Sequence, residues 1–261
     1  MERRFEGKVV VATGVTQGIG EAIVRRFVKE GARVVGGARR PDVLGTMESE
    51  LGENFVGVKT DVTSEADVEN LVAQAVQRFG RVDIGMNVAG GGGMGTIVDL
   101  TGDEYQAVID LSLKGVFYSV KHQARQMIAQ GGGGSIVNVS SLNALVPMYG
   151  GGSYSTSKAA VDMLSKNAAL ELARHRIRVN SLLPGLVSTP ATGPFIDNPE
   201  LFEEFKKKIA AGRAADVEEM TGPALFLASD DASYVTGATL LADGGWAITG
   251  YPDLSPWLSA F

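Results

Sequence analysis

The sequence has no cysteine, only two histidines, and no long apolar or basic run. Without cysteine the chain has no disulfide, no thiolate nucleophile and no zinc–sulfur site. His122 and His175 each lack a carboxylate or a second histidine at ligand spacing. We therefore expect no metal site.

Long apolar and long basic segments are also missing. No run approaches the ~18 apolar residues that span a membrane, and the first residues, MERRFEGKVVVATG, lack the apolar core of a secretion signal. We expect a cytoplasmic protein with no membrane partner. The net charge is −6, and the best basic candidate is Lys206–Lys208. We interpret this run as one solvated helical turn, so no nucleic-acid partner is expected.

What is present is an alternation of two patterns. Short β-branched runs predict strands at residues 8–13, 33–37, 55–59, 82–87, 135–139, 178–183 and 239–242. Helical patterns lie between them, notably at residues 18–30, 65–79, 103–129, 154–174 and 216–228. We therefore predict an α/β fold: a doubly wound, seven-stranded parallel sheet with helices on both faces. We assign residues 1–250 to a single domain and residues 251–261 to an appended tail.

The first strand runs into TGVTQGIG, residues 13–20, and a helix follows at once. Gly14, Gly18 and Gly20 permit a tight turn and a close approach of the backbone to a pyrophosphate. The helix then presents unpaired N–H groups to the anion. A glycine triplet alone is a weak signal, but this strand-to-helix junction favours a dinucleotide site.

The end of the second strand bears on which dinucleotide is bound. A site for NAD usually places an acidic residue there, whereas this chain has Ala38, followed by Arg39 and Arg40. A guanidinium can pair with a 2′-phosphate, so we predict NADP as the preferred cofactor, with NAD possible. The alternative is that both arginines are exposed and only Arg39 stacks on adenine.

A second set of residues suggests redox chemistry. Tyr154 and Lys158 are four residues apart on a predicted helix, and Ser141 follows a buried strand. A phenol with a pKa of about 10 is a poor acid or base at neutral pH. A nearby ammonium and a positive nicotinamide ring would lower that pKa. The Ser141 hydroxyl could bind the substrate oxygen, and Lys158 could hold the ribose hydroxyls.

Together, TGVTQGIG, DVT, NVAG, Ser141, YSTSK, LLPGLVSTP and LADGG resemble the short-chain dehydrogenase/reductase family, up to about Gly245. The resemblance implies a Rossmann-type fold, with Tyr154 as the catalytic acid/base, Lys158 as its partner and Ser141 as the substrate anchor. It also implies that a set of residues surrounds the cofactor: Gly14, Thr16, Gln17, Gly18, Ile19, Gly20, Asp61, Val62, Asn87, Ala89, Gly90, Pro184, Gly185, Val187 and Thr189. Asp61 could instead simply cap a turn.

Two positions depart from the family pattern. In DLSLKGVF, Ser112 stands where the family usually has an asparagine that shapes a bend and binds a water of the proton relay. We hypothesise that Ser112 belongs to a working catalytic relay with altered water geometry. Val88 replaces the second asparagine of the common N-N-A-G, which bears on local strand hydrogen bonding and not on the reaction.

In this family the substrate is contacted mainly from the loop after the sixth strand, here about residues 186–212, whose apolar residues suggest a lid. We expect substrate contacts from Asn143, Leu145, Met148, Tyr149 and Phe195. The resemblance also implies a homotetramer built on helices 103–129 and 154–174. We hypothesise that the tail packs on a neighbouring subunit.

Three function classes follow. The first is a dehydrogenase or reductase for a small ketone or secondary alcohol. The second is a 3-oxoacyl-carrier-protein reductase, for which Arg125, Arg174 and Arg176 could supply a basic pocket mouth. The third is a catalytically silent binding protein on the same fold, against which the Ser141–Tyr154–Lys158 set argues.

Overall fold

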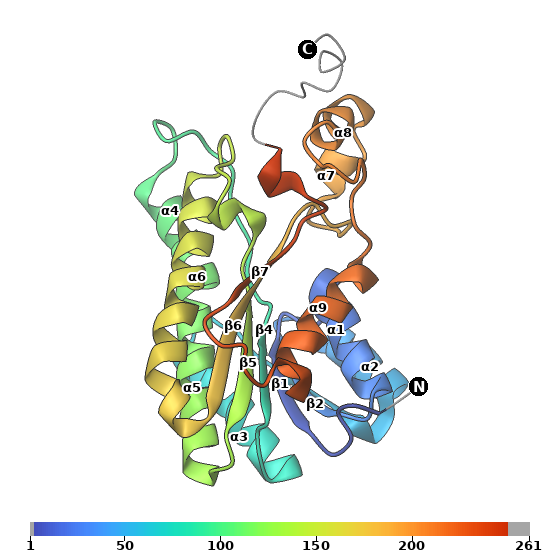
Figure 1. Cartoon of the computed structure of the whole chain (residues 1–261), viewed down its shortest axis with the longest axis vertical. Helices are drawn as coiled ribbons and strands as arrows, with labels where there is room; N and C mark the ends of the chain where they lie inside the picture. Colours follow the sequence, from blue (N-terminus) through green and yellow to red (C-terminus); the bar gives the residue numbers. More distant parts are fainter. Residues whose placement is uncertain (1–2, 250–261) are drawn as a thin grey trace.

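The computed structural model describes residues 3–249 of the chain. Over this range the predicted parallel sheet is confirmed, with seven strands in the order β3-β2-β1-β4-β5-β6-β7 (Figure 1). The strands are β1 (Val9–Thr13), β2 (Arg33–Ala38), β3 (Phe55–Lys59), β4 (Ile84–Asn87), β5 (Gly134–Val139), β6 (Ile177–Pro184) and β7 (Thr239–Ala242). The tail predicted for residues 251–261 lies outside the described residues.

Helices cover both faces of the sheet (Figure 1). On one face lie α1 (Gly18–Lys29), α2 (Pro41–Leu51) and α9 (Thr221–Ala228). On the other lie α3 (Glu65–Phe79), α5 (Gly115–Gln130) and α6 (Gly152–Leu172), with α4 (Gly102–Ile109) leading into α5. Two short helices, α7 (Gly193–Ile196) and α8 (Pro199–Lys206), stand beyond the carboxyl end of the sheet.

The central strand shows why the chain forms two apolar layers. Side chains alternate along a strand, so Val10 and Ala12 of β1 pack with α1, α2 and α9. Val9 and Val11 point the other way and pack with α3, α5 and α6. Burial of both faces of β1 explains why its sequence is a continuous apolar run and not an alternation of apolar and polar residues.

The predicted helix over residues 103–129 is interrupted. Between α4 and α5 the chain forms a π-helical turn, Asp110–Lys114, in which Ser112 is fully buried. The Ser112 hydroxyl donates to the Gly91 carbonyl oxygen at 2.7 Å and accepts from the Gly91 N–H at 3.1 Å. Such turns insert an extra residue into a helix and often occur at functional sites.

Other helix predictions need smaller corrections. The predicted helix over 216–228 begins with a 3₁₀ turn, Val217–Met220, before α9. Helices α2, α7 and α8 were not predicted. Local signals existed for them, since Pro41 and Pro199 stand at first helical positions and the Asn198 side chain caps α8.

The sheet order determines where a ligand can bind. The chain leaves β1 toward β2 and β3, and then returns to the other side of β1 to form β4. At this switch point the connections diverge and open a crevice at the carboxyl ends of the strands. Within residues 3–249, no helix combines the length and the apolar character needed to cross a membrane.

A buried polar network joins β4 and β5 to the helices behind them. The Asn87 amide donates to Asn138 at 2.8 Å and to Gln123 at 3.1 Å, and Gln123 donates back to Asn87 at 2.9 Å. The Asn138 amide donates to the Ser165 hydroxyl of α6 at 2.8 Å. Because these side chains are out of reach of water, each needs its protein partner.

We predict that Asn138→Ala lowers the free energy of unfolding by about 1–3 kcal/mol, because it leaves buried amides without partners. Denaturant titration measures the change. Asn70→Ala, at an exposed position of α3, is the matched control and should change stability by less than about 0.5 kcal/mol. Equal losses in the two variants would contradict a structural role for the network.

Candidate functional site

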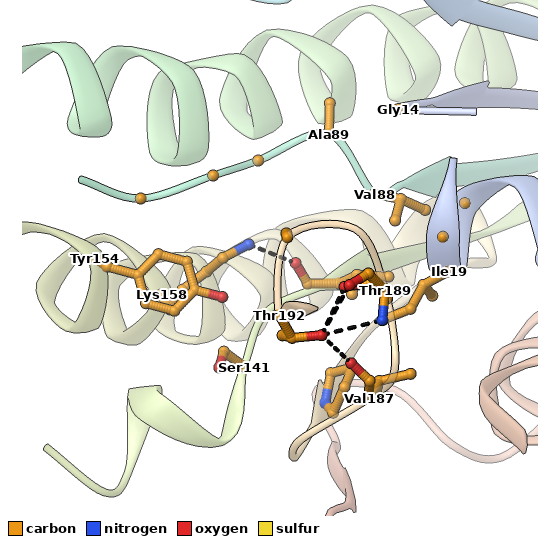
Figure 2. Close-up of a pocket in the computed structure, with 18 of the residues that line it drawn as sticks. Gly14, Ile19, Val88, Ala89, Ser141, Tyr154, Lys158, Val187, Thr189 and Thr192 are labelled. Atoms are coloured by element: carbon orange, nitrogen blue, oxygen red, sulfur yellow. Dashed lines mark hydrogen bonds between the residues drawn. The ribbon is translucent and has the colours of Figure 1, made fainter. Parts of the chain in front are cut away.

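One cavity of about 1010 Å³ lies at the carboxyl ends of the strands. It brings together most of the site residues predicted from the sequence (Figure 2). The predicted residues that line it are Gly14, Thr16, Gln17, Gly18, Ile19, Gly20, Arg39, Arg40, Asp61, Val62, Ala89, Gly90, Ser141, Asn143, Met148, Tyr149, Tyr154, Lys158, Pro184, Gly185, Val187, Thr189 and Phe195.

The turn between β1 and α1 is shaped for a phosphate group. A Cβ on Gly14 would lie 2.6 Å from the Ala89 nitrogen, and one on Gly20 would lie 2.1 Å from the Gly14 carbonyl oxygen. Only glycine fits such contacts. The Gln17 side chain does not cap α1, so the first N–H groups of this helix remain for an anion. The turn therefore fits the pyrophosphate of a dinucleotide.

The two arginines at the end of β2 are arranged differently. One guanidinium nitrogen of Arg40 donates to the Thr16 carbonyl oxygen at 3.0 Å and to the Gln17 side chain at 2.9 Å, which ties it to the phosphate turn. Arg39 lines the cavity and faces Asp61 closely enough to contribute to lowering the pKa of that carboxyl group. Arg40 therefore holds the phosphate turn, whereas Arg39 faces the cavity near Asp61.

The Asp61 carboxylate caps a turn, as one of its two predicted interpretations has it, and it also lines the cavity. Its carboxylate accepts from the Thr63 N–H at 3.0 Å and from the Thr63 hydroxyl at 2.8 Å, which caps the turn after β3. These two hydrogen bonds are the largest causes of its lowered pKa. It also lines the cavity, so its turn-capping role does not remove it from the site.

Tyr154, Lys158 and Ser141 converge at the middle of the cavity (Figure 2). The first two lie on α6, and Ser141 follows the end of β5. The Lys158 ammonium is 5.7 Å from the centre of the Tyr154 ring and donates to the Val139 carbonyl oxygen at 3.0 Å. The Ser140 hydroxyl donates to the Lys158 carbonyl oxygen at 2.7 Å, which fastens α6 to β5.

Burial controls the acidity of both catalytic candidates. It raises the pKa of the Tyr154 hydroxyl, and the hydrogen bond with Ser141 lowers that pKa only in part. Burial lowers the pKa of the Lys158 ammonium to about 8. We expected the ammonium to lower the tyrosine pKa. Desolvation dominates instead, and the Lys158 ammonium donates to the Val139 carbonyl oxygen.

The glycine cluster after β4 passes directly over these side chains. A Cβ on Gly90 would lie 3.0 Å from the Lys158 ammonium nitrogen, and one on Gly92 would lie 2.9 Å from the Tyr154 ring. Gly91 is held by Ser112 through the two hydrogen bonds described above. Glycine is therefore needed here, because a side chain at Gly90 or Gly92 would collide with Lys158 or Tyr154.

At the other side of the cavity, the loop after β6 is held by its own threonines. The Thr192 hydroxyl donates to the Val187 carbonyl oxygen and accepts from the Thr189 N–H (Figure 2). A Cβ on Gly185 would lie 2.7 Å from the Cα of Asp243, so the loop passes close to the end of β7. Thr192 was missed in the sequence, although its spacing from Thr189 is typical of a hydroxyl-capped turn.

Three predicted site residues do not line the cavity. Asn87 is fully buried, and its amide is used by the network with Gln123 and Asn138. Ser112 lies behind Gly91, and Leu145 is 54% exposed to solvent. Phe205 and Trp246 do line the cavity but were not predicted. The sequence did contain a signal for Trp246, because this residue directly follows a glycine pair just after the last strand.

The basic residues considered for an acidic carrier protein lie elsewhere. Arg174 and Arg176 immediately precede β6, and Arg125 lies in the second half of α5, which leads to the start of β5. These positions are at the amino ends of the strands, whereas the cavity lies at the carboxyl ends. They therefore do not form a basic pocket mouth.

Comparison with known proteins places the chain among redox enzymes. Residues 14–247 match the family described as enoyl-(acyl carrier protein) reductase. An L-rhamnose 1-dehydrogenase (NAD(P)(+)) of a Sphingomonas species is 38% identical, over 92% of this chain and 96% of that protein. A 3beta-hydroxysteroid dehydrogenase of Eggerthella lenta is also 38% identical, over 95% and 96%. A short-chain type dehydrogenase/reductase structure from Mycobacterium ulcerans superposes with a TM-score of 0.91 at 33% identity, over 98% and 95%.

We predict that Lys158→Met stabilises the cofactor-free protein at pH 7 by about 1–3 kcal/mol. A pKa lowered from 10.5 to about 8 means that folding penalises the charged lysine. The gain should be complete below about pH 8 and should shrink toward pH 10.5, where the unfolded lysine also becomes neutral. Thermal or denaturant unfolding at several pH values measures it.

Lys59→Met, at an exposed strand position, is the control and should change stability by less than about 0.5 kcal/mol. A Lys158→Met variant less stable than the wild type at pH 7 would contradict a costly buried ammonium.

Proposed function

We propose a function from one premise: the chain belongs to the short-chain dehydrogenase/reductase family. It is an oxidoreductase of alcohol or carbonyl groups. We infer that it transfers hydride between a nicotinamide cofactor and a ketone or secondary alcohol. The observation that carries this proposal is the convergence of the Tyr154 and Ser141 hydroxyls above the buried Lys158 ammonium, in a cavity that begins at a phosphate-binding turn.

The chain's own residues would each take a part in binding or proton transfer. The bound nicotinamide would supply or accept the hydride. Tyr154 would donate a proton to the substrate oxygen during reduction and remove it during oxidation. Ser141, which lines the same cavity as Tyr154, would hold the same oxygen. Lys158 would keep a positive charge beneath the tyrosine and bind the ribose.

The raised pKa of Tyr154 in the cofactor-free chain fits this sequence of events. A neutral phenol is the form that can donate, so the resting chain is poised for reduction. Oxidation needs the phenolate, which a positive ring bound beside it would favour. The acidity of Tyr154 would then depend on which redox form of the cofactor is bound.

We propose NADP as the preferred cofactor, with Arg39 as the discriminating residue. The guanidinium lines the cavity near Asp61, while Arg40 is bound to the phosphate turn. Arg39 could therefore meet a 2′-phosphate, with Arg40 holding the turn in place.

Arg39→Ala should weaken NADPH binding about ten- to a hundredfold, because a charge-assisted hydrogen bond is lost. NADH binding should weaken less than about threefold, and it serves as the internal control. Quenching of tryptophan fluorescence gives both dissociation constants. Equal losses for the two cofactors would exclude Arg39 as the discriminator.

We propose that Ser112 supports catalysis by positioning the glycine segment as well as through a water relay. Its hydroxyl proton is directed at the Gly91 carbonyl oxygen, and this contact fixes the segment that crosses Lys158 and Tyr154.

Ser112→Ala should lower kcat about tenfold and shift its pH profile, while the dissociation constant for NADPH changes less than about threefold. Ser119→Ala is the matched control, since Ser119 is equally buried on the adjoining helix and bonds to the Gly115 carbonyl oxygen. An unchanged rate and pH profile in Ser112→Ala would remove both proposed roles.

We further propose a homotetramer. Apolar side chains stand exposed along α5 and α6, namely Phe117, Ile128, Met163 and Leu170. Exposed apolar side chains along two long helices are typical of a surface that packs against another subunit.

A further inference from the structure

The cavity continues beyond Ser141 and Tyr154 into a second half, which we call the substrate chamber. It is bounded by the residues after β5, the loop after β6 with α7 and α8, and the segment after β7. Large apolar side chains face it from all three, including Leu142, Met148, Leu186, Phe195, Phe205 and Trp246.

Charge is confined to the other half of the cavity. Among the described residues that line it, the ionic side chains are Arg39, Arg40, Asp61 and Lys158. The first three lie at the ends of β2 and β3, and the Lys158 ammonium lies 5.7 Å from the centre of the Tyr154 ring. A charged substrate group in the chamber would therefore lose water without gaining a counter-ion from the described residues.

Two polar side chains of the chamber, Asn143 and Thr192, are already engaged by the protein. The Asn143 amide donates to the Val146 carbonyl oxygen at 3.0 Å, and its oxygen faces the Ser141 hydroxyl at 3.3 Å. Thr192 is bound to the Val187 carbonyl oxygen and to Thr189. The hydroxyls of Ser141 and Tyr154 serve the reacting carbon. Among the described residues, the other side-chain groups that face the chamber without a protein partner are the Trp246 indole N–H and the hydroxyl of Tyr149, a residue that is 88% exposed.

The apolar wall is built as a fixed surface. The Phe205 ring packs against Phe195 at 5.7 Å between centres and against Trp246 at 5.5 Å, edge to face. These rings join α7 and α8 to the segment after β7. The Ala211 N–H donates to the Gly244 carbonyl oxygen at 2.9 Å and closes the same junction. A preformed apolar wall binds hydrocarbon at little ordering cost.

We propose that the substrate is an uncharged, largely hydrocarbon secondary alcohol or its ketone, and not a polyhydroxylated sugar. This inference rests on the proposed hydride transfer and names the substrate class. Apart from Tyr149 and Trp246, the described residues of the chamber offer no free side-chain partner for the additional hydroxyls of a sugar, whereas each added apolar carbon would gain contact.

A panel of alcohols and ketones tests the substrate class. We expect kcat/KM with NADPH to rise about tenfold or more from cyclohexanone to 4-tert-butylcyclohexanone, because the added carbons meet the apolar wall. With NADP⁺, kcat/KM for 4-tert-butylcyclohexanol should exceed that for L-rhamnose and D-glucose at least about a hundredfold. Sugars oxidised as efficiently as the cyclohexanol, or more so, would overturn the proposal.

Binding without turnover separates this proposal from the proposed reaction. The Tyr154→Phe variant loaded with NADPH should bind 4-tert-butylcyclohexanone in a calorimetric titration and should not bind L-rhamnose. Binding of the sugar as tightly as the ketone, or no binding of either, would overturn the substrate class. Binding of the ketone by this variant, with no reduction by the wild type, would instead contradict the proposed reaction.

A pair of phenylalanines provides the matched test of the wall. Phe195→Ser should lower kcat/KM for 4-tert-butylcyclohexanone about tenfold or more, with less than about threefold change for cyclohexanone. Phe202→Ser alters a half-buried residue of α8 that does not line the cavity, and it should affect the two ketones alike. An equal fall in the ratio of kcat/KM for the two ketones in both variants would contradict the proposal that Phe195 forms part of the apolar wall.

Discussion

The buried ammonium of Lys158 is the constraint on which the site depends. A positive charge out of contact with water is costly, and here it is held by one carbonyl oxygen at the end of β5. Three features surround this ammonium. The Ser140 hydroxyl joins α6 to β5. The glycine segment Gly90–Gly92 passes close to the ammonium, and Tyr154 lies one helical turn away. The sheet and its two helical layers keep these elements in register.

The same constraint connects stability with function. The chain lowers the pKa of Lys158 and raises that of Tyr154 by burying both, so the cofactor-free site holds an unfavourable charge beside a neutral phenol. Binding of a dinucleotide with its phosphates at the start of α1 would offset this cost through the contacts made in the complex. Sites that bear such a cost are typical of enzymes, in which function opposes maximal stability.

Much of this arrangement could be predicted from local sequence. Strand and helix patterns gave the parallel sheet, and the glycine turn and the Tyr154–Lys158 spacing identified residues that meet in one cavity. The rest depended on tertiary contacts. The aromatic wall joins Phe195 and Phe205 to Trp246, which is distant in the sequence. The use of the Asn87 amide in a buried network likewise follows from packing between strands and helices, which no local pattern contains.

The most direct test of the account is the titration of Tyr154 itself. Ultraviolet difference spectra between the wild type and Tyr154→Phe isolate its phenolate from the other tyrosines, with and without NADP⁺. The account predicts a raised pKa in the cofactor-free protein and a midpoint about 1–3 pH units lower with NADP⁺ bound, because the positive charge of the oxidised cofactor would favour the phenolate. An identical midpoint in both states would contradict the proposed role of Tyr154 as the acid and base of the reaction.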